Sequence, residues 1–142
     1  MAEWLTTFHL CLVVLDPFTN ESSWLLETAG RLLTNYSAAD VRVGFLVTGT
    51  EAEARQFLGP WVDEVLVFTD PERTTVAGLG LAALPALVHL NTSGAIEDCA
   101  EGWDPDAWHR VAENLSRILG WSRPMIPAPG DPTPFAGSPA LG

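Results

Sequence analysis

The 142-residue sequence predicts one α/β domain in three layers, with helices on both faces of a mixed central β-sheet, followed by a proline-rich tail. Two observations support this prediction. Short apolar runs alternate with segments of helical periodicity, so the two early strands are joined by a helical crossover and should be parallel. A later pair of runs flanks Asn91–Gly94, a turn sequence that makes those strands antiparallel.

The first strand is expected at Phe8–Leu15, an unbroken apolar run of the kind that is covered on both faces. Asn20 is expected to cap the next helix, with Glu21 in the first turn, where the helix dipole favours an acid. The apolar positions of this helix recur near helical spacing, at Trp24, Leu25, Leu32 and Leu33.

The middle of the chain continues the alternation. Val41–Val47 predicts the second strand, and Thr50-Glu51-Ala52-Glu53 matches a capping box for a short helix ending near Leu58. Val65–Phe68 predicts a third, short strand. Asp70 and Pro71 then resemble a cap and a first helical residue, so a helix is expected over Glu72–Leu81.

The hairpin strands are expected at Leu84–Leu90 and Ala95–Ala100. Asp104-Pro105-Asp106 predicts the start of the last helix, with proline at its first position. The apolar stripe of this helix consists of Trp108, Val111, Ala112, Leu115, Ile118 and Leu119.

The composition changes at Ser122. Six prolines and almost no charge occur between Ser122 and Gly142, so the sequence divides into a domain over 1–121 and an extended or disordered tail over 122–142. The tail has P-x-x-P spacings and the apolar residues Met125, Ile126 and Phe135. Disorder is one interpretation; an extended contact with a partner is the other, because stiff proline-rich segments lose little entropy on docking.

The charge excludes several functions. The net charge is −11, with seven arginines and no lysine, so a phosphate-binding or Schiff-base lysine is absent. An acidic chain of this kind is not expected to bind nucleic acid or anionic membranes. The N-terminal apolar run lacks a basic start and is too short to span a bilayer, so we expect no membrane insertion and a cytoplasmic location.

The element order resembles the thioredoxin-like superfamily over about residues 5 to 120, in its thiol-disulfide and peroxiredoxin-type branches. The resemblance rests on "FHLCLVVL", "ESSWLLETAGRLL", "LGLAALPALVHLNTSGAIEDCAEGW" and the additional segment "VDEVLVFTDPERTTVAGLG". It implies a thioredoxin-like three-layer α/β/α sandwich, in which Pro85 takes the place of the family's cis proline and faces the active-site turn.

The sequence departs from this family at its chemistry. The resemblance places the attacking cysteine at the start of the first helix, where the helix dipole stabilises a thiolate. The segment Phe18–Ser23 contains no sulfur, and the CxxC motif is absent. The redox activity of the family therefore does not carry over, and we expect a protein that is not an enzyme and has no cofactor.

The two cysteines are expected to be far apart. Cys11 lies in a buried run and should be inert, whereas acids beside Cys99 should raise its pKa. In the family's strand order a strand separates the two, which argues against an internal disulfide. A single-cysteine thiol enzyme or redox sensor using Cys99 is the alternative function.

The other polar residues do not predict a metal site. His9 and His89 are expected as a structural pair, and the acidic run Glu97–Asp106 as a solvated connection, with a docking face for a basic partner as its alternative. Of the tryptophans, Trp24, Trp61 and Trp108 have plausible core positions, whereas Trp103 and Trp121 are expected to be partly exposed.

The main functional prediction is a redox-inactive thioredoxin-fold protein that binds a protein partner, as an accessory subunit or assembly chaperone of a larger complex, such as a redox or hydrogenase-type complex. A small ligand in the vacant cleft is a weaker hypothesis. The partner-binding candidates are Phe18, Thr19, Asn20, Leu84, Pro85, Trp103, Met125, Ile126 and Phe135.

Overall fold

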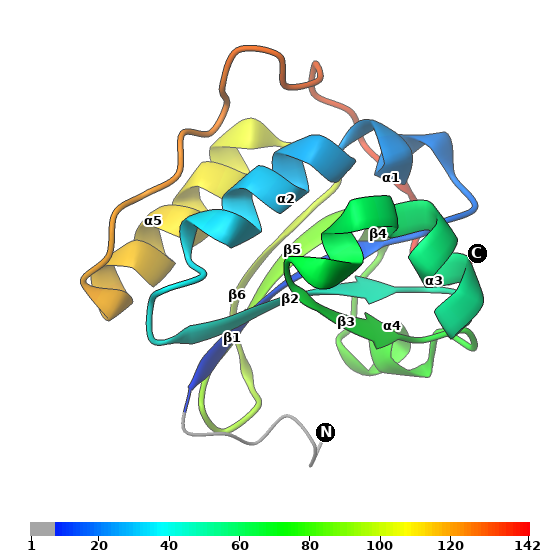
Figure 1. The fold of residues 1–142 in the computed structure, drawn as a ribbon, viewed down its shortest axis with the longest axis horizontal. Coiled ribbons are helices and arrows are strands. Elements are labelled where there is room, and N and C mark those ends of the chain that lie inside the picture. The colour runs from blue at the N-terminus through cyan, green and yellow to red at the C-terminus, as the bar shows by residue number, and fades with distance from the viewer. Residues whose placement is uncertain (1–7) are drawn as a thin grey trace.

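A computed structural model describes residues 8–142; residues 1–7, which the sequence assigns to the domain, lie outside the described part. The central sheet has five strands in the order β3-β2-β1-β5-β6 (Figure 1). These strands are β1 (His9–Leu15), β2 (Val41–Val47), β3 (Leu66–Thr69), β5 (Ala86–Leu90) and β6 (Ile96–Glu101). β1, β2 and β3 are parallel, whereas β5 is antiparallel to both β1 and β6, which confirms the mixed sheet.

Helices cover both faces of this sheet. They are α1 (Asn20–Trp24), α2 (Leu26–Asn35), α3 (Glu51–Leu58), the 3₁₀ helix η2 (Gly59–Asp63), α4 (Thr74–Gly78) and α5 (Pro105–Leu119). Buried residues of α2, α3 and α5 join one core cluster, and those of α4 join the cluster on the opposite face. In Figure 1, α2 and α5 lie side by side above the sheet and α4 lies below it. The three-layer α/β/α prediction is confirmed.

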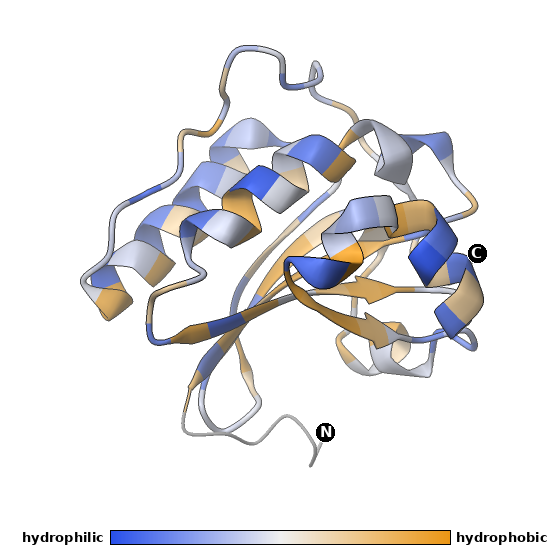
Figure 2. Cartoon of the chain, in the orientation of Figure 1, coloured by the Kyte–Doolittle hydropathy of each residue, from blue (hydrophilic) through white to orange (hydrophobic). Residues whose placement is uncertain are grey.

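Strand β1 lies at the centre of both clusters. Its alternate residues Cys11, Val13 and Leu15 face the cluster below α2 and α5, and the intervening residues face the other cluster. Figure 2 shows the neighbouring strands β2 and β3 as mostly hydrophobic. A strand with two buried faces needs an apolar side chain at every position, which explains the unbroken run that predicted it.

The first helix differs from the prediction. Asn20 is not the cap but the first helical residue, and Thr19 occupies the cap position without a side-chain hydrogen bond. The turn before the helix is closed by Asp16, whose carbonyl oxygen accepts the Thr19 amide proton at 3.3 Å, so the helix begins one residue early. The helix also breaks at Leu25, and this break leaves Trp24 57% exposed instead of in the core.

The fourth helix is shorter than predicted. It begins at Thr74 behind Arg73, which has the left-handed φ of 61°, and it ends at Gly78. The predicted cap, Asp70, is instead the first residue of a turn, in which its carbonyl oxygen accepts the Arg73 amide proton. Its carboxylate nevertheless accepts the Val76 amide proton at 2.8 Å, so it satisfies a free amide of the first turn from outside the helix.

Pro85 divides the predicted strand Leu84–Leu90 into two. Residues before it form β4 (Ala83–Leu84) and residues after it form β5, because proline has no amide proton to contribute to a ladder. The Leu84–Pro85 peptide bond is cis, as the resemblance implies. The capping box of α3 and the start of α5 are confirmed, whereas Ile118 is 49% exposed and lies outside the predicted stripe.

The tail lies extended over the domain (Figure 1, orange to red). Its strand β7 (Ser138–Pro139) pairs antiparallel with β4 in a second, two-stranded sheet. Upstream, Asp131 forms an ion pair with Arg31 of α2 at 2.8 Å. The proline-rich segment is therefore packed against the domain. Backbone pairing and polar contacts fix its position.

Within the described residues, no helix combines the length and apolar character needed to cross a bilayer.

The N-cap of α5 provides a test of this architecture. The Asp104 carboxylate accepts the Ala107 amide proton at 3.3 Å, so Asp104→Ala should lower the free energy of unfolding by about 1 kcal/mol in urea denaturation. Asp106→Ala is the matched control, because it removes a first-turn acid and leaves the cap; its expected loss is about 0.3 kcal/mol at moderate salt. Equal losses would contradict the assigned cap.

Candidate functional site

The junction between β1 and α1 is built around Asp16, whose side chain is buried. Its Oδ1 accepts the Phe18 amide proton at 3.0 Å, and its own amide donates to Ser22 Oγ at 2.9 Å. Ser22 is fully buried in α1. These bonds hold a tight turn at the place where the resemblance puts the reactive cysteine, and the turn presents the exposed Phe18 ring and no sulfur.

Arg73 holds the same carboxylate from the side of α4. One guanidinium nitrogen, Nη2, lies 2.8 Å from Asp16 Oδ2, and the other, Nη1, donates to the Ala140 carbonyl oxygen at 2.7 Å. The ion pair is largely buried, with side-chain exposures of 17% for Arg73 and 4% for Asp16. The planar fork of arginine suits two acceptors at once. This side chain therefore ties the junction to the end of the tail.

The cis proline lies beside this junction. Leu84 is fully buried, and the Pro85 carbonyl oxygen accepts the Gly102 amide proton at 2.8 Å. Just upstream, Glu101 Oε1 accepts the amide protons of Ala82 and Ala83, both at 3.1 Å. Glu101 thus satisfies the amide before β4 and the first amide of β4, while β4 itself pairs with the tail.

The tail occupies the place where the sequence predicts a partner groove. Ser138 pairs with Leu84 in the β4–β7 ladder, and its hydroxyl donates to Glu21 Oε2 at 2.9 Å. One tail residue thus contacts both the first turn of α1 and the residue before the cis proline. These residues, predicted to contact a partner, are contacted here by a segment of the same chain.

Phe135 extends this contact. Its backbone exchanges two hydrogen bonds with Trp103, at 2.8 and 3.0 Å, and its ring packs edge-to-face on Trp24 with centroids 5.7 Å apart. Trp103 is fully buried, and its indole nitrogen donates to the Pro132 carbonyl at 2.7 Å. The expectation that Trp103 is partly exposed is therefore wrong, because the tail covers it.

The partner-binding candidates fall into three groups. Leu84, Pro85 and Trp103 lie beneath the tail, to which Phe135 belongs, whereas Phe18, Thr19 and Asn20 form the turn at the start of α1. Met125 and Ile126 belong to a separate part of the tail, where Arg31 donates to the Met125 carbonyl. Phe18 is 63% and Met125 66% exposed, whereas Ile126 is 6% exposed.

The sequence analysis missed three residues that organise the site, Asp16, Arg73 and Ser138, and it missed the acceptor role of Glu21. Asp16 directly follows a fully buried strand, a position where a carboxylate needs a partner, and that was an available signal. No sequence signal indicated that Arg73 would reach Asp16 or that Ser138 would reach Glu21, since both contacts join segments distant in sequence.

The two thiols lie on different strands, and the pKa of each is raised. Cys11 pairs across the sheet with His89 of β5, and Cys99 lies on β6, so β5 separates them and both are free. Burial raises the pKa of Cys11 to about 12. The pKa of Cys99 is also raised, first by burial and then by the charges of Glu101 and Asp98. The expected effect of the acids is confirmed, although burial is the larger cause.

His9 and His89 form the expected pair. Nδ1 of His9 lies 2.8 Å from Nε2 of His89, so one ring donates and the other accepts. His89 is fully buried, and its Nδ1 has no partner among the described residues. Burial, followed by the proximity of His9, lowers the pKa of His89. Within residues 8–142, no three His, Cys, Asp or Glu side chains gather as a metal-ligand cluster.

The acidic run supplies structural contacts. Asp98 accepts from Arg110 at 3.3 Å and from Asn114 at 3.1 Å, and Glu97 accepts from Asn91 at 3.1 Å. Together with the bonds of Glu101 and Asp104 already described, these contacts engage most of its carboxylates inside the chain. They favour the interpretation as a connection between β6 and α5.

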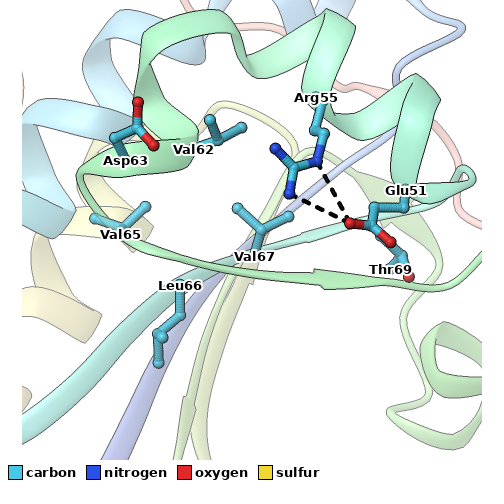
Figure 3. A pocket seen from close by; sticks show the side chains of 8 residues that line it. All are labelled: Glu51, Arg55, Val62, Asp63, Val65, Leu66, Val67 and Thr69. Atoms are coloured by element: carbon cyan, nitrogen blue, oxygen red, sulfur yellow. Dashed lines mark hydrogen bonds and ion pairs between the residues drawn. The ribbon is translucent and has the colours of Figure 1, made fainter.

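A cavity of about 480 Å³ lies at the outer edge of β3 (Figure 3). Val62, Val65 and Val67 line it, and the Arg55–Glu51 ion pair, with a shortest separation of 3.3 Å, lies at its rim. Arg55 and Glu51 are both exposed, and no described polar atom is buried in it without a partner. The cavity is separate from the junction of Asp16 and the cis proline.

No protein-family model and no curated protein matches the chain. Solved structures resemble its fold. A protein from Chlorobium tepidum assigned as thiol:disulfide interchange protein DsbE aligns with a TM-score of 0.64 and 15% identity, over 84% of each chain. A protein from Neisseria meningitidis assigned as a thioredoxin gives 0.65 and 14%, over 81% of this chain and 77% of its own.

The DsbF structure of Mycobacterium tuberculosis, in mixed oxidized and reduced forms, gives a TM-score of 0.63 and 17% identity, over 80% of this chain and 84% of its own. At such low identity these likenesses establish the fold and nothing more. The fold is thioredoxin-like, as the resemblance implied, and it is carried by a chain that has two separated cysteines and no CxxC pair.

The histidine pair predicts a pH dependence of stability. Because the pKa of His89 is below its ordinary value of 6.5, the folded state binds fewer protons than the unfolded state. The free energy of unfolding should therefore fall as pH is lowered from about 7.5 to about 5.5. His89→Leu should make this fall smaller in urea denaturation at the two pH values. If His89→Leu left the pH dependence unchanged, His89 would not be its source.

The thiols predict slow labelling. With a maleimide at neutral pH, Cys99 should react more slowly than a free cysteine, and Cys11 should react only after unfolding, because each pKa is raised. Cys11→Ser and Cys99→Ser variants identify which thiol is labelled. Rapid modification of Cys99 would support its role as a reactive thiol.

Proposed function

We propose that this chain is a redox-inactive thioredoxin-fold protein that binds a protein partner, as an accessory subunit or assembly chaperone of a larger complex, with a redox or hydrogenase-type complex as one possibility. The first turn of α1 carries the proposal. It presents Glu21, bonded to Ser138, where a thiolate would be needed. A carboxylate at that position opposes a neighbouring thiolate and is not a disulfide-exchange nucleophile.

The surface around this turn supports a role in contact. Phe18 and Trp24 are 63% and 57% exposed, and the half-buried Phe135 ring packs against Trp24. Large aromatic side chains contribute strongly to the binding energy of protein interfaces. We define Phe18, Trp24 and Phe135 as the aromatic rim, and we propose that the partner contacts it.

The composition is compatible with a protein ligand. A net charge of −11 repels nucleic acid and anionic lipids and favours a partner that carries positive charge. We further propose a cytoplasmic location, because both cysteines are free and separated by a strand, as in proteins of reducing compartments. The proposed activity requires no metal or cofactor.

Site-specific photo-crosslinking tests the proposal. A benzophenone amino acid at position 18 in cells of the source organism should give a discrete adduct, because Phe18 is the most exposed member of the aromatic rim. Thr92 is the control, since it is exposed in the hairpin turn at the opposite end of β5 from Pro85.

The absence of an adduct at both position 18 and position 24, or the same adduct from position 92, would contradict the proposal. Disulfide reductase or peroxidase turnover that survives replacement of both cysteines by serine would contradict the non-enzymatic function.

A further inference from the structure

The groove at the cis proline is filled by six residues of the tail. We call Phe135–Ala140 the tail segment, and we define the groove as β4, α1, Trp103 and Arg73, which the tail segment contacts. We propose that this groove binds an extended segment of a partner protein with the pattern of the tail segment: an aromatic residue, a glycine two positions later, then a hydroxyl residue, and alanine two positions beyond that. The tail segment is then the intramolecular competitor of the partner. This inference rests on the proposed binding function and specifies its ligand.

The glycine position is the most selective. Gly137 has a φ of 88°, and a Cβ added there would lie 2.5 Å from the Leu84 carbonyl oxygen and 3.3 Å from Gly102 Cα. Gly102 lies on the other side of the same approach, since its added Cβ would be 2.5 Å from the Ala136 carbonyl oxygen. The two backbones approach too closely for any side chain. A competing segment therefore needs glycine at this position.

At the hydroxyl position, the Glu21 carboxylate accepts a hydrogen bond from the ligand side chain. Ser138 donates to Glu21 Oε2 at 2.9 Å while its backbone pairs with Leu84. A serine or threonine hydroxyl can donate this bond, whereas an acidic side chain would meet the Glu21 charge. Glu21, at the place where the resemblance puts the redox cysteine, thus becomes a determinant of ligand choice.

The size of the side chain is the selective feature at the alanine position. Ala140 is 1% exposed and belongs to the core cluster beneath α4. Its amide donates to the Ala82 carbonyl oxygen at 2.9 Å, and its own carbonyl accepts from Arg73. A closely packed site of this kind has no room for a larger side chain. The next residue, Leu141, is 60% exposed and is not read.

The hold of the tail segment is suited to exchange. It depends on backbone hydrogen bonds, the Ser138 hydroxyl and one small buried side chain, and the Phe135 ring remains half-buried. An extended peptide that adds a strand to a free edge can reproduce each of these contacts in trans. Because the tail segment is tethered, it competes at an effective concentration on the order of millimolar. A partner binds appreciably only where it overcomes that competition.

Two glycine variants of the full chain test the inference. Gly137→Ala places its Cβ against the Leu84 carbonyl and should release the tail segment. Gly130→Ala is the matched control, since Gly130 is also in the tail, has a φ of 92°, and has open space around its added Cβ. The probe is a fluorescein-labelled peptide with the sequence of residues 131–142, followed by fluorescence anisotropy.

The peptide should bind the Gly137→Ala protein with a Kd at least about tenfold lower than it shows for wild type or the Gly130→Ala protein. Peptides that carry the G137A or S138A substitution should lose this binding. Phe135→Ala is a second way to loosen the tail segment without a steric clash, and it should also increase peptide binding if Gly137→Ala fails to fold. Circular dichroism establishes that each variant is folded.

Equal peptide binding by wild type and by folded, loosened variants would overturn the inference. The inference would also be overturned if the loosened variants bound the G137A-substituted peptide as tightly as the unsubstituted peptide. These results are separable from the crosslinking test, because an adduct at position 18 with no peptide binding contradicts only the ligand assigned here. Loss of both contradicts the binding function itself.

Discussion

The buried ion pair between Asp16 and Arg73 is the interaction on which the site depends. It joins the end of the central strand, the turn before α4 and the Ala140 carbonyl, three segments that are distant in the sequence. Both side chains are largely buried, so the removal of either one would leave an uncompensated charge or unsatisfied hydrogen-bonding groups. The position of the junction and the docking of the tail are therefore coupled through one guanidinium.

Around this pair lie the structural features of the thioredoxin-like fold at its cis proline, with no cysteine among them. The cis Leu84–Pro85 bond, the short α1 and the close strand β1 are in place, yet Glu21 stands at the first turn. The groove that remains is satisfied by backbone from the same chain, which explains how an edge strand such as β4 persists without pairing with other molecules. Under the proposed binding function, a partner would have to displace this tethered segment, so its observed affinity would be weaker than its intrinsic affinity for the groove.

Particular elements show why some predictions succeed. The unbroken apolar run of β1 and the capping box at Thr50 and Glu53 are local patterns with local causes, and both are present as expected. Asn20 was assigned as a cap on its intrinsic preference, but the hydrogen bonds of Asp16 start the helix at that residue instead. Trp103 is buried by a segment about thirty residues further along the chain. The residues near Trp103 in the sequence do not indicate this contact, so partial exposure was the local expectation.

The sequence by itself determined the layered α/β fold and the absence of a CxxC pair, because hydrophobic periodicity, turn residues and the lack of sulfur at the start of the first helix can be read along the chain. The cis proline at position 85 followed from the family resemblance. Only the tertiary structure decided that the tail fills the groove. That outcome depends on the close approach of Gly137 to Leu84 and on the reach of Ser138 to Glu21. Proline-rich composition leaves such a segment without a periodic signal, so its place is set by contacts that exist only once the sheet and the junction have formed.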